Sequence, residues 1–138
     1  MATQIDELFT NARAHEGRFE GPRAVVPARH VAIVTCMDSR IDNFAIFGLE
    51  SGEAHILRNA GGIITDDMLR SLVLSQSLLQ TREIILMHHT DCGMKFPDVD
   101  EAVRTALRLV REHPSLPHRN NVRGFVYEVE RGRVREVI

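Results

Sequence analysis

The sequence predicts an open three-layer α/β sheet, mainly parallel, with an antiparallel strand at its C-terminal edge. Three short runs rich in Ile, Val and Leu have the composition of buried parallel strands, namely residues 30–36, 53–59 and 82–89. Two longer segments carry apolar residues at helical spacing, and the chain ends in residues that alternate between apolar and polar. Strands that alternate with helices are typical of a sheet covered by helices.

The elements follow one another in order along the chain. Residues 4–15 predict a short helix, and the proline-punctuated stretch 20–29 predicts a linker into the first strand. A helix is expected over residues 65–80, with Thr65 as its N-cap and an apolar face made of Met68, Leu69, Leu72, Val73, Leu78 and Leu79. A second helix is expected over residues 98–113, ending before Pro114, with an apolar face made of Val99, Val103, Ala106, Leu107 and Val110. Residues 122–138 alternate around Arg131 and Gly132, which predicts two antiparallel strands.

Length and charge bound the class of protein. The chain has 138 residues, which predicts one domain, 1–138, whose residues 1–29 form the N-terminal helix and linker. Its 17 Lys and Arg against 19 Asp and Glu create no field that would attract nucleic acid or an anionic membrane. No apolar run reaches the roughly 18 residues of a membrane span, and the first ten residues lack the pattern of a signal peptide. We therefore expect a cytoplasmic protein without nucleic-acid or membrane partners.

The only two cysteines, Cys36 and Cys92, suggest a metal site. In a reducing compartment a disulfide is not expected, which leaves buried thiols, redox chemistry or a metal. Cys36 ends the first predicted strand, and Cys92 closely follows the third, beside two histidines. Ligands of open α/β sheets collect at the carboxyl ends of the strands, so these side chains are expected to converge. Two thiolates and one imidazole, with a fourth position open, are typical of a catalytic zinc ion.

The spacing favours His89 over His88 as the imidazole ligand. Adjacent residues on a strand point to opposite faces, so only one of the two is expected to join the site. His89 begins an H-x-x-C motif with Cys92, which can bring both side chains onto one ion. His88 is expected in the core or beside the pocket.

Three motifs in this order resemble the β-class carbonic anhydrases, in particular the short bacterial members. They are CMDSR at 36–40, RNAGG at 58–62 and HTDCG at 89–93, and the likeness extends to the last strands. The resemblance implies one zinc ion per chain, held by Cys36, His89 and Cys92. It also implies the activity of a carbonate dehydratase, a lyase: zinc-bound hydroxide attacks carbon dioxide to give bicarbonate and a proton.

The same resemblance assigns roles to the residues around the metal. Asp38 would accept a hydrogen bond from the nucleophile, and Arg40 would hold that carboxylate by a bidentate pair. In the family such an aspartate can also turn onto the metal as a fourth ligand and close the site, so Asp38 is a conditional ligand. Gly61 and Gly62 either bring backbone N–H groups to the substrate or only form a strand-to-helix turn.

Further expectations concern the surroundings of the site. The resemblance implies a dimer or a multiple of dimers. The apolar residues of the stretch 41–50 could belong to the core or to a dimer surface, and we expect the dimer surface; they are Phe44, Ile46, Phe47 and Leu49. Only Met94 and Lys95 separate Gly93 from the segment FPDVDEA, where the resemblance implies a longer connection and a wall of the pocket. Four methionines are expected to fill the core, namely Met37, Met68, Met87 and Met94.

Two other functions remain open. The first is a related zinc hydrolase that acts on carbon disulfide or carbonyl sulfide with the same metal hydroxide. The second is a non-catalytic protein, in which zinc only stabilises the fold or the two thiols respond to oxidation.

Overall fold

The computed structural model describes residues 1–138 and contains a five-stranded sheet with the strand order β2-β1-β3-β4-β5. The strands β1 (Val31–Cys36), β2 (Ala54–Asn59), β3 (Glu83–His89) and β4 (Val122–Glu128) run parallel. The last strand, β5 (Arg133–Val137), pairs antiparallel with β4. The predicted mainly parallel sheet with an antiparallel edge is confirmed.

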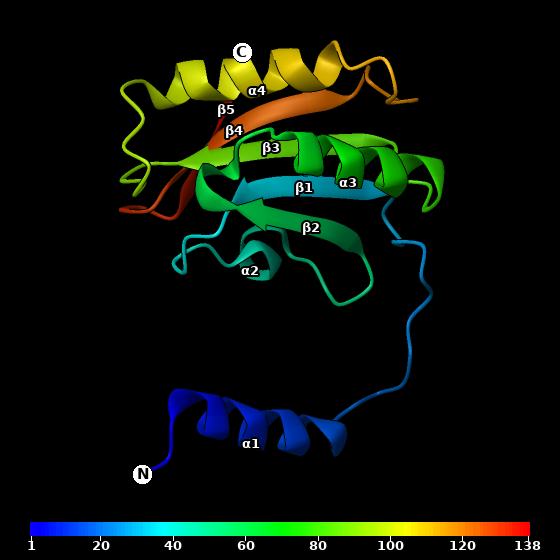
Figure 1. Ribbon diagram of the computed structural model, residues 1–138, viewed down its shortest axis with the longest axis vertical. Coiled ribbons are helices and arrows are strands. Elements are labelled where there is room, and N and C mark those ends of the chain that lie inside the picture. Colours follow the sequence, from blue (N-terminus) through cyan, green and yellow to red (C-terminus); the bar gives the residue numbers. More distant parts are fainter.

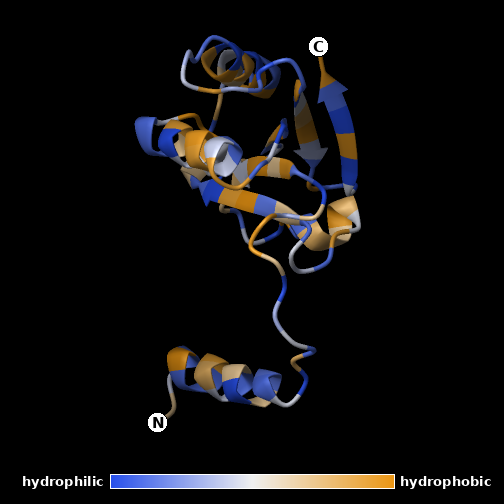
Figure 2. Ribbon diagram, turned by 90° about the vertical axis from the view of Figure 1, so that its right-hand side faces the viewer, coloured by the Kyte–Doolittle hydropathy of each residue, from blue (hydrophilic) through white to orange (hydrophobic).

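Helices cover both faces of the sheet, but unequally. Helices α3 (Asp66–Ser77) and α4 (Val99–Arg111) lie on one face, and the short α2 (Asn43–Phe47) lies on the other (Figures 1 and 2). The main core fills the space between the sheet and α3 and α4, with Val34, Leu86 and Val126 on the strands. The predicted inner face of α4 is buried at four positions, Val103, Ala106, Leu107 and Val110. No helix combines the length and apolar composition needed to cross a bilayer.

Helix α3 begins where the sequence predicts and buries two residues of the predicted face, Met68 and Leu72, but the face is polar toward the end of the helix. Thr65 Oγ1 accepts a hydrogen bond from Met68 N at 3.2 Å, as an N-cap does. Leu78 lies beyond the last helical residue, and 69% of its surface is exposed. The polar residue Ser75 is buried instead, because its hydroxyl oxygen lies 2.7 Å from both His55 Nδ1 and Thr81 Oγ1. A satisfied hydroxyl can be buried at little cost, so an apolar residue is not required there.

The stretch 41–50 contains α2, which the sequence analysis did not predict. Ile46 and Phe47 pack against a second, smaller core around Ile41 and Met87, so part of this apolar stretch is core. Phe44 remains 49% exposed. The expectation that all four methionines fill the core is wrong for Met37 and Met94, which are 66% and 48% exposed, whereas Met68 and Met87 are buried.

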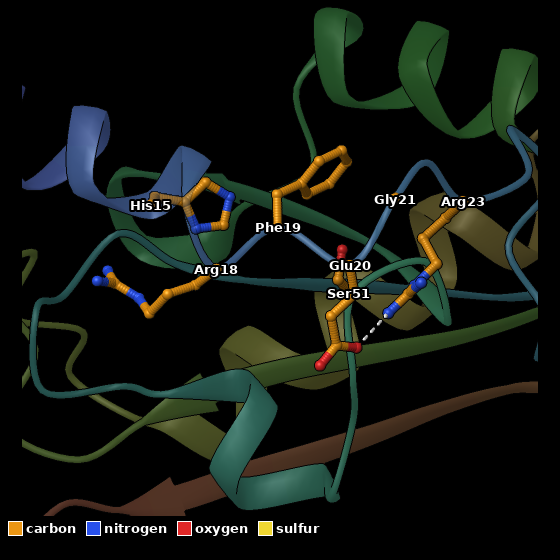
Figure 3. Close-up of a pocket in the computed structure, with 7 residues that line it drawn as sticks. All are labelled: His15, Arg18, Phe19, Glu20, Gly21, Arg23 and Ser51. Carbon is orange, nitrogen blue, oxygen red and sulfur yellow. Dashed lines mark ion pairs between the residues drawn. The ribbon is translucent and has the colours of Figure 1, made fainter.

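Helix α1 (Gln4–Glu16) stands apart from the sheet (Figures 1 and 2). Thr3 and Asp6 form a capping box at its N-terminus, and none of its residues is buried. The linker that follows reaches the domain at Arg23, whose Cβ would lie 3.0 Å from a Cβ placed on Gly52. A hollow of about 210 Å³ forms there between the end of α1, the linker and Ser51 (Figure 3).

Candidate metal centre

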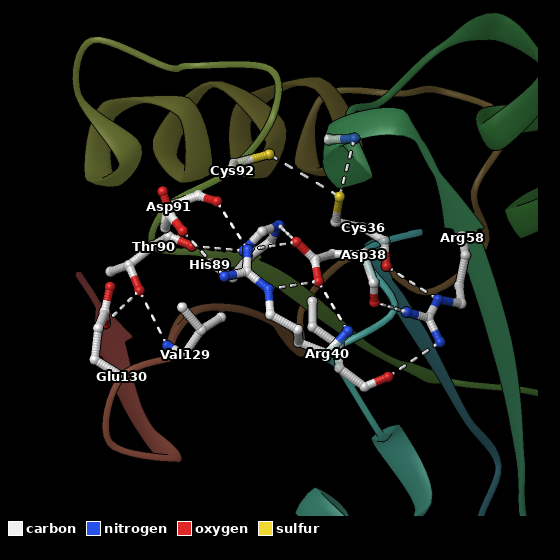
Figure 4. A network of polar contacts seen from close by, with 12 residues as sticks. Cys36, Asp38, Arg40, Arg58, His89, Thr90, Asp91, Cys92, Val129 and Glu130 are labelled. Carbon is white, nitrogen blue, oxygen red and sulfur yellow. Dashed lines mark hydrogen bonds and ion pairs between the residues drawn. The ribbon is translucent and has the colours of Figure 1, made fainter.

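Two neighbouring strands bring the predicted metal ligands to one edge of the sheet. Strand β1 ends at Cys36 and its parallel neighbour β3 ends at His89, and the turn after β3 carries Cys92. The ligand atoms of these three residues lie within 4.8 Å of one another, and the two Sγ atoms are 4.0 Å apart (Figure 4). The residues that the sequence singled out therefore form one cluster.

His89 presents an unused ring nitrogen to this cluster. Its Nδ1 lies 2.7 Å from the carbonyl oxygen of Thr90, and a carbonyl can only accept, so Nδ1 carries the proton. The other nitrogen, Nε2, then bears a lone pair, and it is buried without a hydrogen-bond partner. Buried polar atoms without a partner are rare in proteins. A neutral imidazole oriented through its other N–H is the usual state of a histidine that binds a metal.

The two cysteines are free thiols in different surroundings. Cys36 is buried, and its Sγ accepts a hydrogen bond from Gly61 N at 3.3 Å. Cys92 is half-buried, and this burial raises the pKa of its thiol, with the neighbouring Cys36 adding to the effect. A bound cation would reverse this preference, because a coordinating thiol is deprotonated.

Asp38 and Arg40 form a multiple hydrogen-bonded pair beside the cluster. The carboxylate accepts from Arg40 Nε at 3.0 Å, from Arg40 Nη2 at 2.7 Å and from the backbone N of Arg40 at 2.8 Å. These bonds hold the pKa of Asp38 well below its usual range, and together with Asp91 they raise the pKa of Arg40. Asp38 Oδ2 lies 3.7 Å from His89 Nε2, too far for a hydrogen bond. The carboxylate thus lies next to the cluster but faces Arg40.

The glycine pair packs against the end of β1. Gly61 and Gly62 are buried and have positive φ values of 85° and 64°. A Cβ on Gly62 would lie 2.9 Å from the carbonyl carbon of Thr35, so no larger residue fits without a shift of the main chain. The N–H of Gly61 is directed to Cys36 Sγ, which makes the turn a support for a candidate ligand. Substrate binding by these glycines stays a prediction.

His88 lies apart from the cluster, as the alternation along β3 requires. It is buried, its Nε2 lies 3.3 Å from the carbonyl oxygen of Gly62, and its ring stacks on Phe96 with 5.3 Å between the ring centroids. Burial lowers the pKa of His88, so the ring is neutral at physiological pH.

Two residues of the site were not assigned a role from the sequence. Asp91 accepts hydrogen bonds from Arg40 through its carboxylate and its carbonyl oxygen. Arg58 donates to three main-chain carbonyls, one at the end of β1 and two in the loop that follows it (Figure 4). Both residues fall inside the recognised motifs, but only the folded chain shows which groups they contact.

A cavity of about 380 Å³ adjoins the cluster, lined by His89, Thr90, Asp91, Cys92, Lys95, Phe96, Pro97 and Val99. Most of its wall is the short connection between β3 and α4. A mainly parallel sheet with a Cys-His-Cys cluster at the carboxyl ends of its strands places the chain among α/β proteins that can hold a metal ion.

Comparison with known proteins identifies the family within this class. The chain matches the carbonic anhydrase family over residues 31–113. It is 40% identical over 160 residues to Beta-carbonic anhydrase 1 of Mycobacterium tuberculosis, covering 98% of either chain. The crystal structure of a carbonic anhydrase from Streptococcus mutans matches with a TM-score of 0.94 at 36% identity, covering 100% of this chain and 99% of that one. A carbon disulfide hydrolase of an Acidianus strain is 31% identical, covering 78% of this chain and 77% of its own.

The chain belongs to the β-class carbonic anhydrase family. The family, the fold class and the enzyme class predicted from the sequence are confirmed. The alignment with the mycobacterial relative spans 160 residues and this chain has 138, so that relative carries residues that this chain lacks.

Proposed function

We propose that this protein catalyses the reversible hydration of carbon dioxide to bicarbonate and a proton, with one zinc ion held by Cys36, His89 and Cys92. Membership of the family supports the reaction. The observation that carries the assignment of ligands is the buried, unpaired Nε2 of His89, clustered with two free thiols.

The donor set fits zinc. Two thiolates and one imidazole are borderline-soft ligands, and three protein ligands leave a fourth position for a small molecule. Zinc bound there would act as a Lewis acid and lower the pKa of a water ligand toward about 7, so that a hydroxide nucleophile is available near neutral pH.

Asp38 orients the nucleophile in this proposal. Because hydrogen bonds from Arg40 hold the pKa of Asp38 well below its usual range, the carboxylate is ionised at neutral pH. An ionised carboxylate only accepts hydrogen bonds, so it binds the O–H of the nucleophile and leaves an oxygen lone pair for carbon dioxide. Arg40 supports this role because its three hydrogen bonds fix both carboxylate oxygens.

Zinc analysis combined with a hydration assay tests the proposal. We expect one zinc per chain and rapid hydration of carbon dioxide in a stopped-flow assay with a pH indicator at pH 8.5. The variant Cys92→Ser should lose both the metal and the activity, whereas His118→Ala, at an exposed histidine outside the cluster, should keep both. A zinc-loaded protein that does not hydrate carbon dioxide would refute the assignment.

A zinc hydrolase of carbon disulfide or carbonyl sulfide is the second candidate. The relative in Acidianus that is named carbon disulfide hydrolase favours it, although the mycobacterial relative is more similar and matches more of the chain. Release of hydrogen sulfide from either substrate, at a rate above that of carbon dioxide hydration, would select this alternative.

We also propose a cytoplasmic homodimer or a multiple of dimers. Helix α1 supports an assembly, because Ile5, Leu8 and Phe9 are 78%, 63% and 57% exposed on a helix that packs on nothing in its own chain. Isolated helices of this length are marginal in water, so α1 gains most if a second copy covers its apolar side chains. Sedimentation of the double variant Leu8→Asp/Phe9→Asp should show a weaker dimer, whereas Gln4→Ala should sediment as the wild type does.

A further inference from the structure

Arg58 directs its guanidinium to the main chain at the end of β1 and in the loop that follows it. Its Nε donates to Cys36 O at 3.0 Å, its Nη2 to Asp38 O at 2.7 Å and its Nη1 to Ile41 O at 3.2 Å (Figure 4). A guanidinium is planar and presents its donors in a fixed arrangement. Three bonds from one rigid group therefore set the relative positions of three carbonyls within the six residues 36–41.

Arg58 makes these bonds without pairing with an acid. No carboxylate lies within 4.0 Å of its guanidinium, although nine other arginines of the chain form ion pairs. The side chain is also exposed, so burial of its charge does not explain the contacts. The hydrogen bonds of Arg58 therefore serve to fix the shape of the main chain over residues 36–41.

Asp38 lies at the centre of the fixed segment. The bond from Arg58 to Asp38 O sets the peptide plane after Asp38 and so the direction in which its side chain leaves the main chain. The other main-chain ties of the segment are Met37 N to Asn59 O at 2.8 Å and Ile41 N to Asp38 O at 3.1 Å. In this shape the carboxylate can accept the backbone N–H of Arg40 as well as its guanidinium.

We propose that Arg58 is a positioning residue of the active site, which holds residues 36–41 so that Asp38 faces Arg40 and leaves the fourth metal position free. With Asp38 Oδ2 already 3.7 Å from His89 Nε2, a looser loop lets the carboxylate turn into the cluster and block that position. The inference rests on the proposed function, because it assumes a metal held by Cys36, His89 and Cys92.

Azide binding to the cobalt-substituted protein, followed by visible absorption, reports whether the fourth position is free without measuring activity. We expect Arg58→Ala to bind azide about tenfold more weakly than the wild type, because an internal ligand lowers the apparent affinity by the fraction of sites left free. Arg82→Ala is the matched control, since Arg82 is exposed and its side chain makes no hydrogen bond or ion pair, and it should bind azide normally.

Two further measurements separate positioning from a general loss of structure. The double variant Arg58→Ala/Asp38→Ala should bind azide as tightly as Asp38→Ala alone, because the blocking carboxylate is gone. Millimolar guanidinium chloride should restore azide binding to Arg58→Ala, whereas ammonium chloride and the variant Arg58→Lys should not, because one ammonium cannot span three carbonyls.

Contrary results would separate a failure of the proposed role of Arg58 from a failure of the proposed metal site. Wild-type azide affinity in cobalt-loaded Arg58→Ala would overturn the inference, and so would equal weakening in the presence and absence of Asp38. Failure of the Arg58→Ala protein to take up cobalt, even with guanidinium present, would also overturn the inference. Such a result would mean that Arg58 is needed to form the metal site itself and not only to position Asp38. Failure of the wild-type protein to bind cobalt would instead refute the proposed metal site.

Discussion

Arg40 and Asp91 join the loop that follows β1 to the loop that follows β3. Arg40 Nη1 lies 3.0 Å from Asp91 Oδ2, and Arg40 Nη2 donates to Asp91 O at 2.9 Å. The same guanidinium binds Asp38, so one side chain connects the two segments that contain Cys36 and Cys92. The separation between the two sulfur atoms therefore depends partly on a contact between exposed residues.

Loss of Arg40 should reduce the hydration rate much more than loss of Asp91. The side chain of Asp91 is 74% exposed, so Asp91→Ala should lower the free energy of unfolding by less than about 1 kcal/mol and retain most of the hydration rate. Arg40→Ala leaves Asp38 unpaired and should lower kcat about tenfold or more. Urea unfolding and stopped-flow hydration measure the two effects. Equal losses of kcat in both variants would contradict this view of Arg40.

The pair of Asp100 and Arg135 links α4 to β5 and should make stability depend on pH. Hydrogen bonds of 2.7 and 3.0 Å from Arg135 lower the pKa of Asp100. A lowered pKa means that the stabilisation is complete above the ordinary pKa near 4 and is lost as the pH falls through the lowered value.

Asp100→Asn should therefore lose about 1 kcal/mol between pH 5 and 8, and the difference from the wild type should shrink toward zero below pH 4. Urea unfolding across this range provides the test. Glu16→Gln, at an exposed acid of α1 without a partner, should match the wild type throughout. A difference that stays unchanged as the pH falls from 5 to 2 would show that the loss comes from something other than the charge of Asp100.

Adjacent histidines provide a direct test of the ligand assignment. His89→Ala should abolish zinc binding, because it removes the unpaired Nε2. His88→Ala removes a stacked ring and a hydrogen bond in the core, so it should cost about 1 to 3 kcal/mol of stability but keep one zinc per chain. Metal analysis and thermal unfolding separate these effects. Retention of zinc by His89→Ala but not by His88→Ala would reverse the assignment.

Removal of the metal should make the two thiols reactive toward each other. With Sγ atoms 4.0 Å apart, Cys36 and Cys92 need only a small movement to form a disulfide under mild oxidation. The chelated protein should lose two free thiols by titration and fail to take up zinc until it is reduced, whereas the zinc-loaded protein should resist the oxidant. Equal oxidation with and without zinc would argue against thiolate coordination.

The glycine turn should tolerate no side chain at its second position. Gly62→Ala combines a positive φ of 64° with a contact of 2.9 Å to the main chain of Thr35 and should cost at least about 2 kcal/mol. Gly93→Ala is the matched control, because a Cβ there would meet no atom within 4 Å and φ is not positive. Comparable stability of the two variants would show that the turn can relax.

Periodicity predicted the elements that are long or strongly patterned, but not those set by tertiary contacts. The five residues of α2 are too few for a helical period, although Asp42 caps the helix and Gly48 ends it in a left-handed conformation. Leu78 looked like part of an apolar face because nothing in the sequence shows that α3 ends at Ser77. The cluster itself was predictable, since strand ends and motif spacing identify Cys36, His89 and Cys92. The bonds of Arg58 depend on carbonyl groups, which every residue has, so no residue type signals them.

The candidate ligands lie on or next to strands that have a neighbour on each side, β1 between β2 and β3, and β3 between β1 and β4. Amide hydrogens in such strands exchange with solvent only when the whole domain opens. A metal ion bound at Cys36 and His89 would therefore raise the free energy of opening of the whole sheet. Hydrogen exchange would become slower even in β4.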